Sequence, residues 1–90
     1  MTHAETANTA IAELRETFDK FKRRRKPHTK NDLAQLEASV QVAAGVLYAR
    51  WAALQWKDNP PELRKPRAAL LEMKFELREW RDKLDAEAVR

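Results

Sequence analysis

The residues from Lys20 to Lys30 form the densest concentration of charge in the sequence. Seven of these eleven residues are Lys or Arg, and none is acidic. Clustered cations can contact phosphate groups or an acidic protein surface. The run therefore predicts an anion-contacting site, whose members are Lys20, Lys22, Arg23, Arg24, Arg25, Lys26 and Lys30.

The same run has a second interpretation, as the solvated end of a helix. Cations near a helix C-terminus complement the partial negative charge there. In an antiparallel bundle the end of the chain would return to this pole and bring three acidic residues that could neutralise part of the run: Asp82, Asp85 and Glu87. No helix-turn-helix or zinc-finger spacing is present. Contact with nucleic acid would therefore be mostly to phosphates.

Residues that perform catalysis or hold metal ions are scattered along the chain. His3 and His28 stand apart and cysteine is absent, so no metal-ligand spacing can be recognised. Carboxylates such as Glu72 and Glu79 lie one turn from Lys or Arg residues, as helix-surface pairs do. No phosphate-binding loop or nucleophile motif occurs. We expect no enzyme activity, no metal, no cofactor and no small-molecule substrate.

The composition favours an all-α protein. The chain has 90 residues and one glycine, Gly45, whereas a β protein of this size would need several turn glycines. Ninety residues fit one domain, covering 1–90. No stretch of about 18 apolar residues and no signal-peptide pattern is present. We therefore expect a cytoplasmic protein that does not enter a membrane.

Apolar periodicity predicts three helices, at about residues 4–24, 31–56 and 66–88. Pro27 should end the first helix, and Thr29 or Asn31 should cap the second. Pro66 should begin the third helix, because a proline deeper in a helix removes a hydrogen bond. Asn59, Pro60 and Pro61 are expected to form a separate single turn before it.

The predicted helix 31–56 is apolar on two opposite faces. One face carries Leu33, Leu36, Val40, Ala43, Leu47 and Leu54, with Trp51 at its edge. At 100° per residue a second set lies almost opposite: Ala38, Val42, Val46, Ala49, Ala53 and Trp56. A surface helix usually has one apolar stripe, so a helix with two is expected to be covered on both sides. Small side chains around Gly45 would let a neighbouring helix approach closely.

These features predict either a three-helix antiparallel bundle or a flatter, sheet-like three-helix array with the long second helix at its centre. The second face is then covered by a flanking helix of the same chain or by another chain. Leu71 and Phe75 lie off the main apolar face of the third helix. We favour a homodimer, since two-fold dimers are the commonest soluble oligomers.

The function predicted first is that of a small non-enzymatic helical interaction protein, a regulator or inhibitor that docks on a macromolecular partner. The alternative is a nucleic-acid-associated protein that contacts phosphates through residues 20–30, and a third is a subunit of a larger helical assembly. Off-face apolar residues would supply the docking contacts. The candidate protein interface comprises Val42, Val46, Ala49, Ala53, Trp56, Leu71 and Phe75.

Overall fold

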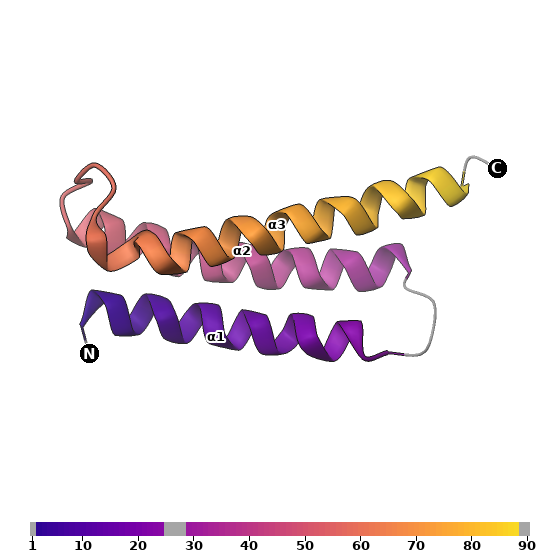
Figure 1. The fold of residues 1–90 in the computed structure, drawn as a ribbon, viewed down its shortest axis with the longest axis horizontal. Coiled ribbons are helices and arrows are strands. Elements are labelled where there is room, and N and C mark those ends of the chain that lie inside the picture. Colours follow the sequence, from indigo (N-terminus) through magenta and orange to yellow (C-terminus); the bar gives the residue numbers. More distant parts are fainter. Residues whose placement is uncertain (1, 25–28, 89–90) are drawn as a thin grey trace.

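Three helices packed side by side form the protein in this computed structural model, which describes residues 2–24 and 29–88 (Figure 1). They are α1 (His3–Lys22), α2 (Lys30–Ala53) and α3 (Pro61–Ala88). Successive helices run in opposite directions, and each packs against both of the others. The prediction of an all-α three-helix bundle is confirmed. The bundle is elongated, with principal extents of 48 × 22 × 17 Å.

The core lies along the axis of the bundle and consists of the apolar positions spaced three and four residues apart. On α1 the buried positions are Ala7, Ile11, Leu14, Phe18 and Phe21, and on α2 they are Leu33, Leu36, Val40, Ala43 and Leu47. The third helix adds Leu63, Leu70, Met73 and Leu77. Trp80 closes one end of this core, with its ring centroid 5.7 Å from that of Phe18 and 5.1 Å from that of Phe21.

Local signals fix the beginning of α2. The Thr29 hydroxyl accepts a hydrogen bond of 3.1 Å from the Asp32 backbone N–H, and the Asp32 carboxylate accepts one of 3.0 Å from the Thr29 backbone N–H. This reciprocal pair is a capping box, which satisfies two donors that the helix itself cannot. The predicted cap at Thr29 is therefore confirmed. Pro27, expected to end the first helix, lies outside the described residues, as does His28.

The end of α2 comes three residues earlier than the sequence predicted. Leu54 caps the helix, and Gln55 and Trp56 follow with φ angles of 58° and 55°. The Gln55 N–H donates to the Ala52 carbonyl and the Trp56 N–H to the Trp51 carbonyl, which is the Schellman pattern. The prediction was wrong because the position that most often signals this ending carries Gln55 instead of glycine.

The start of α3 was also predicted wrongly, because the helix begins at Pro61 and continues through Pro66. The ring of Pro66 is fully buried, in line with the buried Pro60, Leu63 and Leu70. Burial of that ring offsets the hydrogen bond that Pro66 cannot donate to the carbonyl of Glu62. Because Glu62 lies at an exposed position, a water molecule can donate a hydrogen bond to its carbonyl in place of the missing N–H.

Candidate interaction surfaces

The outer face of α2 is exposed. We define this face by its six exposed small or apolar residues: Ala38, Val42, Gly45, Ala49, Ala52 and Ala53. Val42 keeps 71% of its surface accessible, while Val46, at the border with α1, is half-buried. Helices α1 and α3 both pack on the opposite side of α2, and α1 reaches only the edge of the outer face, at Val42. The hypothesis that flanking helices of the same chain cover both faces is therefore wrong.

Gly45 lies in the middle of this outer face. A Cβ atom added there would have no atom within 4 Å, apart from the neighbouring chain and the backbone of α2 itself. The expected close approach of a neighbouring helix at Gly45 is therefore absent within the described chain. Between Glu37 and Arg50 the sequence of α2 carries no charge. The outer face is consequently flat, small-featured and uncharged along its middle.

Leu71 and Phe75 form a second exposed apolar pair, one turn apart on α3. Leu71 is 53% exposed and Phe75 is 64% exposed. Their predicted position off the core face of the third helix is confirmed. Both are flanked by charged residues of the same helix, whereas the outer face of α2 is not.

The seven predicted interface residues do not share one surface. Val42 lines a hollow against α1, together with Ala10 and Thr17, whereas Leu71 lines a groove between α2 and α3. Trp56 is 57% exposed but lies beyond the end of α2, where its ring packs edge-on against Trp51 with centroids 5.1 Å apart. The structure thus separates the α2 residues from Leu71 and Phe75.

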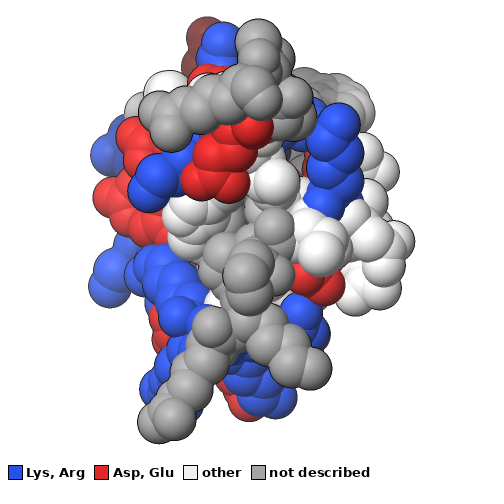
Figure 2. Space-filling view, turned by 90° about the vertical axis from the view of Figure 1, so that its right-hand side faces the viewer, with Lys and Arg blue, Asp and Glu red and all other residues white. Residues whose placement is uncertain are grey.

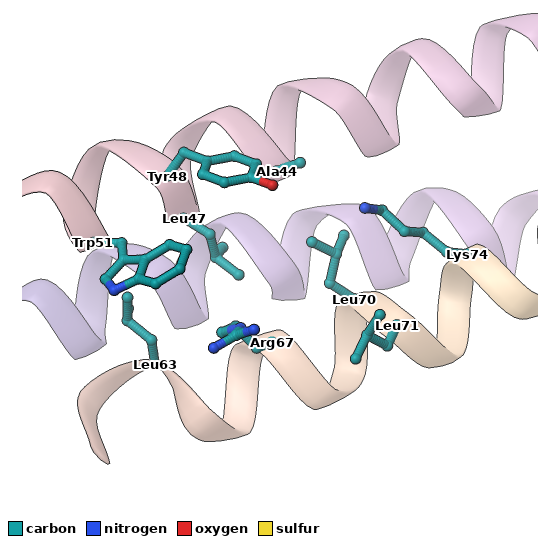
Figure 3. A pocket seen from close by; sticks show the side chains of 9 residues that line it. All are labelled: Ala44, Leu47, Tyr48, Trp51, Leu63, Arg67, Leu70, Leu71 and Lys74. Carbon is teal, nitrogen blue, oxygen red and sulfur yellow. The ribbon is translucent and has the colours of Figure 1, made fainter. Parts of the chain in front are cut away.

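The groove between α2 and α3 was missed by sequence reasoning (Figure 3). Tyr48 and Trp51 form its wall on α2, with ring centroids 6.3 Å apart. The guanidinium of Arg67 lies over the Trp51 ring, 5.3 Å from its centroid. Lys74 lines the same groove about two turns further along α3. Trp51 was expected at the core edge, where it lies, but its pairing with Arg67 depends on how α3 packs against α2.

The basic run is partly neutralised in the structure. Lys22 pairs with Glu76 at 3.0 Å and Arg24 with Asp32 at 3.0 Å, while Lys20 pairs with Glu16 one turn away at 3.5 Å. Arg23 and Lys30 form no ion pair within the described part of the chain. Arg25 and Lys26 lie outside the described residues.

The acidic partners of the basic run differ from those expected. The C-terminal end of α3 does return to this pole, as Figure 1 shows. Among the described residues, however, Asp82, Asp85 and Glu87 form no ion pair with the run. For the described part of the run the neutralising carboxylates are others, because α3 places Glu76, and not its last two turns, beside Lys22. Figure 2 views this pole end-on, and its described part shows blue, red and white surfaces interspersed.

Asp32 has the one resolved pKa shift among the described residues. The hydrogen bond from the Thr29 backbone N–H lowers the pKa of Asp32 below 3.8, and Arg24 acts in the same direction. The carboxylate therefore has a structural role at the start of α2. In the described part of the chain, no three His, Cys, Asp or Glu residues come together in a metal-binding arrangement. No described helix is long and apolar enough to cross a membrane.

No protein-family model, no curated protein and no solved structure matches the chain. The function of the chain must therefore be inferred from its surfaces.

Proposed function

We propose that this protein is a small non-enzymatic interaction protein that docks on a macromolecular partner through the outer face of α2, as a regulator or inhibitor. The observation that carries the proposal is that α2 is apolar on both sides while the bundle buries only one of them. Helices that are apolar all round are normally buried. A cytoplasmic location belongs to the same proposal and is supported by the absence of cysteine.

The small side chains of the outer face favour a helix or sheet edge of a partner that approaches closely. Two packed helices lie 8–10 Å apart according to the side chains between them, and Ala and Gly give the shortest distances. Removing this apolar area from water would stabilise the complex by about 25 cal/mol for each Å² buried. With no charge between Glu37 and Arg50, docking would strip water from no charged group in the middle of the face.

Gly45→Leu tests the proposal. Because nothing in the bundle approaches a Cβ at Gly45 and leucine is a strong helix former, the variant should fold at least as stably as the wild type. Its side chain would nevertheless hold a partner away from the outer face. We expect capture of the partner from the native host to be lost. Undiminished capture by Gly45→Leu would contradict the proposal.

A control variant separates loss of docking from a general effect of added apolar surface. Ala12→Leu adds the same side chain to an exposed position of α1. We expect Ala12→Leu to capture the same partner as the wild type. Gly45→Ala should raise the free energy of unfolding by about 1 kcal/mol and weaken capture less than Gly45→Leu does.

Nucleic-acid association through the basic run is the second candidate function. It is supported by Arg23 and Lys30, which are exposed and form no ion pair with the described residues. Phosphate contacts release counterions, so binding to duplex DNA or RNA must weaken steeply as salt is raised. Replacing Arg23, Arg24 and Arg25 with Ala should abolish it while helicity is kept. Absence of binding at low salt would exclude this function.

A further inference from the structure

The charged residues around Leu71 and Phe75 are sorted by sign across the outer side of α3. Arg67 and Lys74 lie on the edge toward α2, where both line the groove. Glu72 and Glu79, at 100° per residue, lie on the opposite edge, toward α1. The apolar pair thus lies between a basic edge and an acidic edge, and this side of the helix points away from the core.

None of these four charges forms an ion pair within the described part of the bundle. Two neighbouring charges of α3 are used to hold the helices together: Glu76 pairs with Lys22, and Arg81 pairs with Glu37 at 2.6 Å. Among the described residues, no such ion pair involves Arg67, Lys74, Glu72 or Glu79. The four charges that flank Leu71 and Phe75 are therefore available to another chain.

We propose that a second copy of this chain docks on this side of α3, with the two α3 helices parallel. Ala68, Leu71 and Phe75 follow one another at spacings of three and four residues, as the seam of a two-stranded coiled coil does. In a parallel pair, the residue that precedes Ala68 or Phe75 lies beside the residue five positions later in the sequence of the other helix. Arg67 of each copy then faces Glu72 of the other copy, and Lys74 of each copy faces Glu79 of the other.

The same charges select the parallel arrangement. In an antiparallel pair, the basic edge of one helix lies against the basic edge of the other. Arg67 and Lys74 of the two copies would then repel each other. Arg78 and Asp82 occupy the next two seam positions, and the apolar contact ends there because in a parallel pair each of them would face its own counterpart. Stacking of Arg67 on Trp51 leaves the edge of its guanidinium open to a carboxylate.

This contact is separate from the docking surface proposed above and does not depend on it. In Figure 1, α3 lies along one edge of the molecule, and Leu71 and Phe75 are exposed on this helix. The outer face of α2 stays exposed in such a dimer. Gly45→Leu should therefore leave self-association unchanged, which keeps failure of one proposal distinguishable from failure of the other.

Charge reversal tests the pairing by sedimentation or light scattering across a concentration series. The wild type should rise from 10.5 kDa toward twice that mass as concentration increases. Arg67→Glu with Lys74→Glu should raise the dissociation constant about tenfold or more, because like charges then face each other. Glu72→Lys with Glu79→Lys should do the same. A wild type that remains monomeric to millimolar concentration would overturn the proposal.

Mixing the two charge-reversed proteins gives the sharper result. Each cannot pair with itself, but one presents four acidic edge positions and the other four basic ones, so the mixture should form a one-to-one heterodimer. Arg15→Glu with Lys57→Glu makes the same change of net charge away from α3 and should self-associate like the wild type. The proposal would be overturned if the mixture failed to associate, or if the control variant self-associated as weakly as the charge-reversed proteins do.

An engineered disulfide tests the direction of the helices. Ala68→Cys places a thiol at the seam, and in a parallel pair the two Cα atoms come within the roughly 4.4–6.8 Å that a disulfide requires. Mild oxidation should therefore link two copies through residue 68, whereas Ala12→Cys on α1 should not link. If Ala68→Cys remains unlinked under conditions in which the wild type is dimeric, the parallel pairing is wrong.

Discussion

The indole Nε1 of Trp51 donates a hydrogen bond of 2.7 Å to the main-chain carbonyl of Lys57. This bond joins the last full turn of α2 to the connection that leads into α3. The Trp51 ring also receives Trp56 edge-on and Arg67 on its face. One side chain therefore organises both the reversal of the chain and the groove between α2 and α3.

Trp51→Phe should lower the free energy of unfolding by about 1 kcal/mol, since it keeps an aromatic ring but removes the donor to Lys57. The measurement is urea unfolding followed by circular dichroism. Trp56→Phe is the matched control, because Trp56 is exposed and its indole makes no hydrogen bond to the described residues. Equal effects of the two variants would show that the hydrogen bond does not stabilise the turn.

Gln55→Gly should raise the free energy of unfolding by about 1 kcal/mol. The φ angle of 58° at Gln55 is unfavourable for a residue with a Cβ atom and costs nothing for glycine. The opposite sign is expected for Ala34→Gly, at an exposed position inside α2, which should lose about 1 kcal/mol. Thermal unfolding of both variants checks the pair, and destabilisation by Gln55→Gly would contradict the observed end of α2.

Acid should weaken the start of α2. The pKa of Asp32 is lowered in the folded protein by the Thr29 backbone N–H and by Arg24. The unfolded chain therefore takes up a proton at this residue before the folded protein does. The resulting stabilisation is complete above about pH 3.8 and is lost as pH falls through the lowered pKa.

The measurement for this prediction is the free energy of unfolding between pH 5 and pH 2. Asp32→Asn should reduce the part of the slope that lies below pH 3.8, and Thr29→Ala should lower stability by about 1 kcal/mol at neutral pH through loss of the cap. Glu5→Gln supplies a control on an exposed carboxylate of α1. An unchanged slope in Asp32→Asn would contradict the role assigned to this carboxylate.

Two phenylalanines should differ strongly in how much their truncation destabilises the fold. Phe18 is 1% exposed and packs against Trp80, so Phe18→Ala should cost about 3–5 kcal/mol. Phe75→Ala, on the outer side of α3, should change the stability of the monomer by less than about 0.5 kcal/mol. Chemical unfolding at low protein concentration measures both, and a large loss in Phe75→Ala would show that Phe75 belongs to the core.

Periodicity predicted most of the core but missed Leu63, which is 1% exposed in the part of α3 that was expected to be a separate turn. Leu14, Phe18, Leu36 and Leu47 are buried as their spacing indicates, because burial of an amphipathic helix is decided by which residues share one stripe. Pro66 was misplaced since its compensation is tertiary: the buried ring contributes only when α3 packs on the bundle. The end of α2 was misplaced because Gln55 adopts a left-handed backbone that residue type does not reveal.

The candidate surfaces were only half predictable from the sequence. Projection on a helix showed that Val42 and Ala49 lie opposite the core stripe, but it could not show whether a flanking helix covers them. That depends on both α1 and α3 packing against the same side of α2. The pairing of Arg67 with Trp51 and the separation of Leu71 from Val42 likewise follow from the arrangement of the helices, which sequence spacing does not encode.

The central claim, that the outer face of α2 docks on a partner, is tested most directly by photo-crosslinking in the native host. A photoreactive phenylalanine derivative would be placed at Gln41, which is exposed on α2 one turn before Gly45 and leaves the small side chains of the outer face unchanged, and at Ala12 on α1 as the control. We predict one defined covalent adduct from position 41 and none from position 12. Absence of an adduct at position 41, or the same adducts from both positions, would contradict the claim.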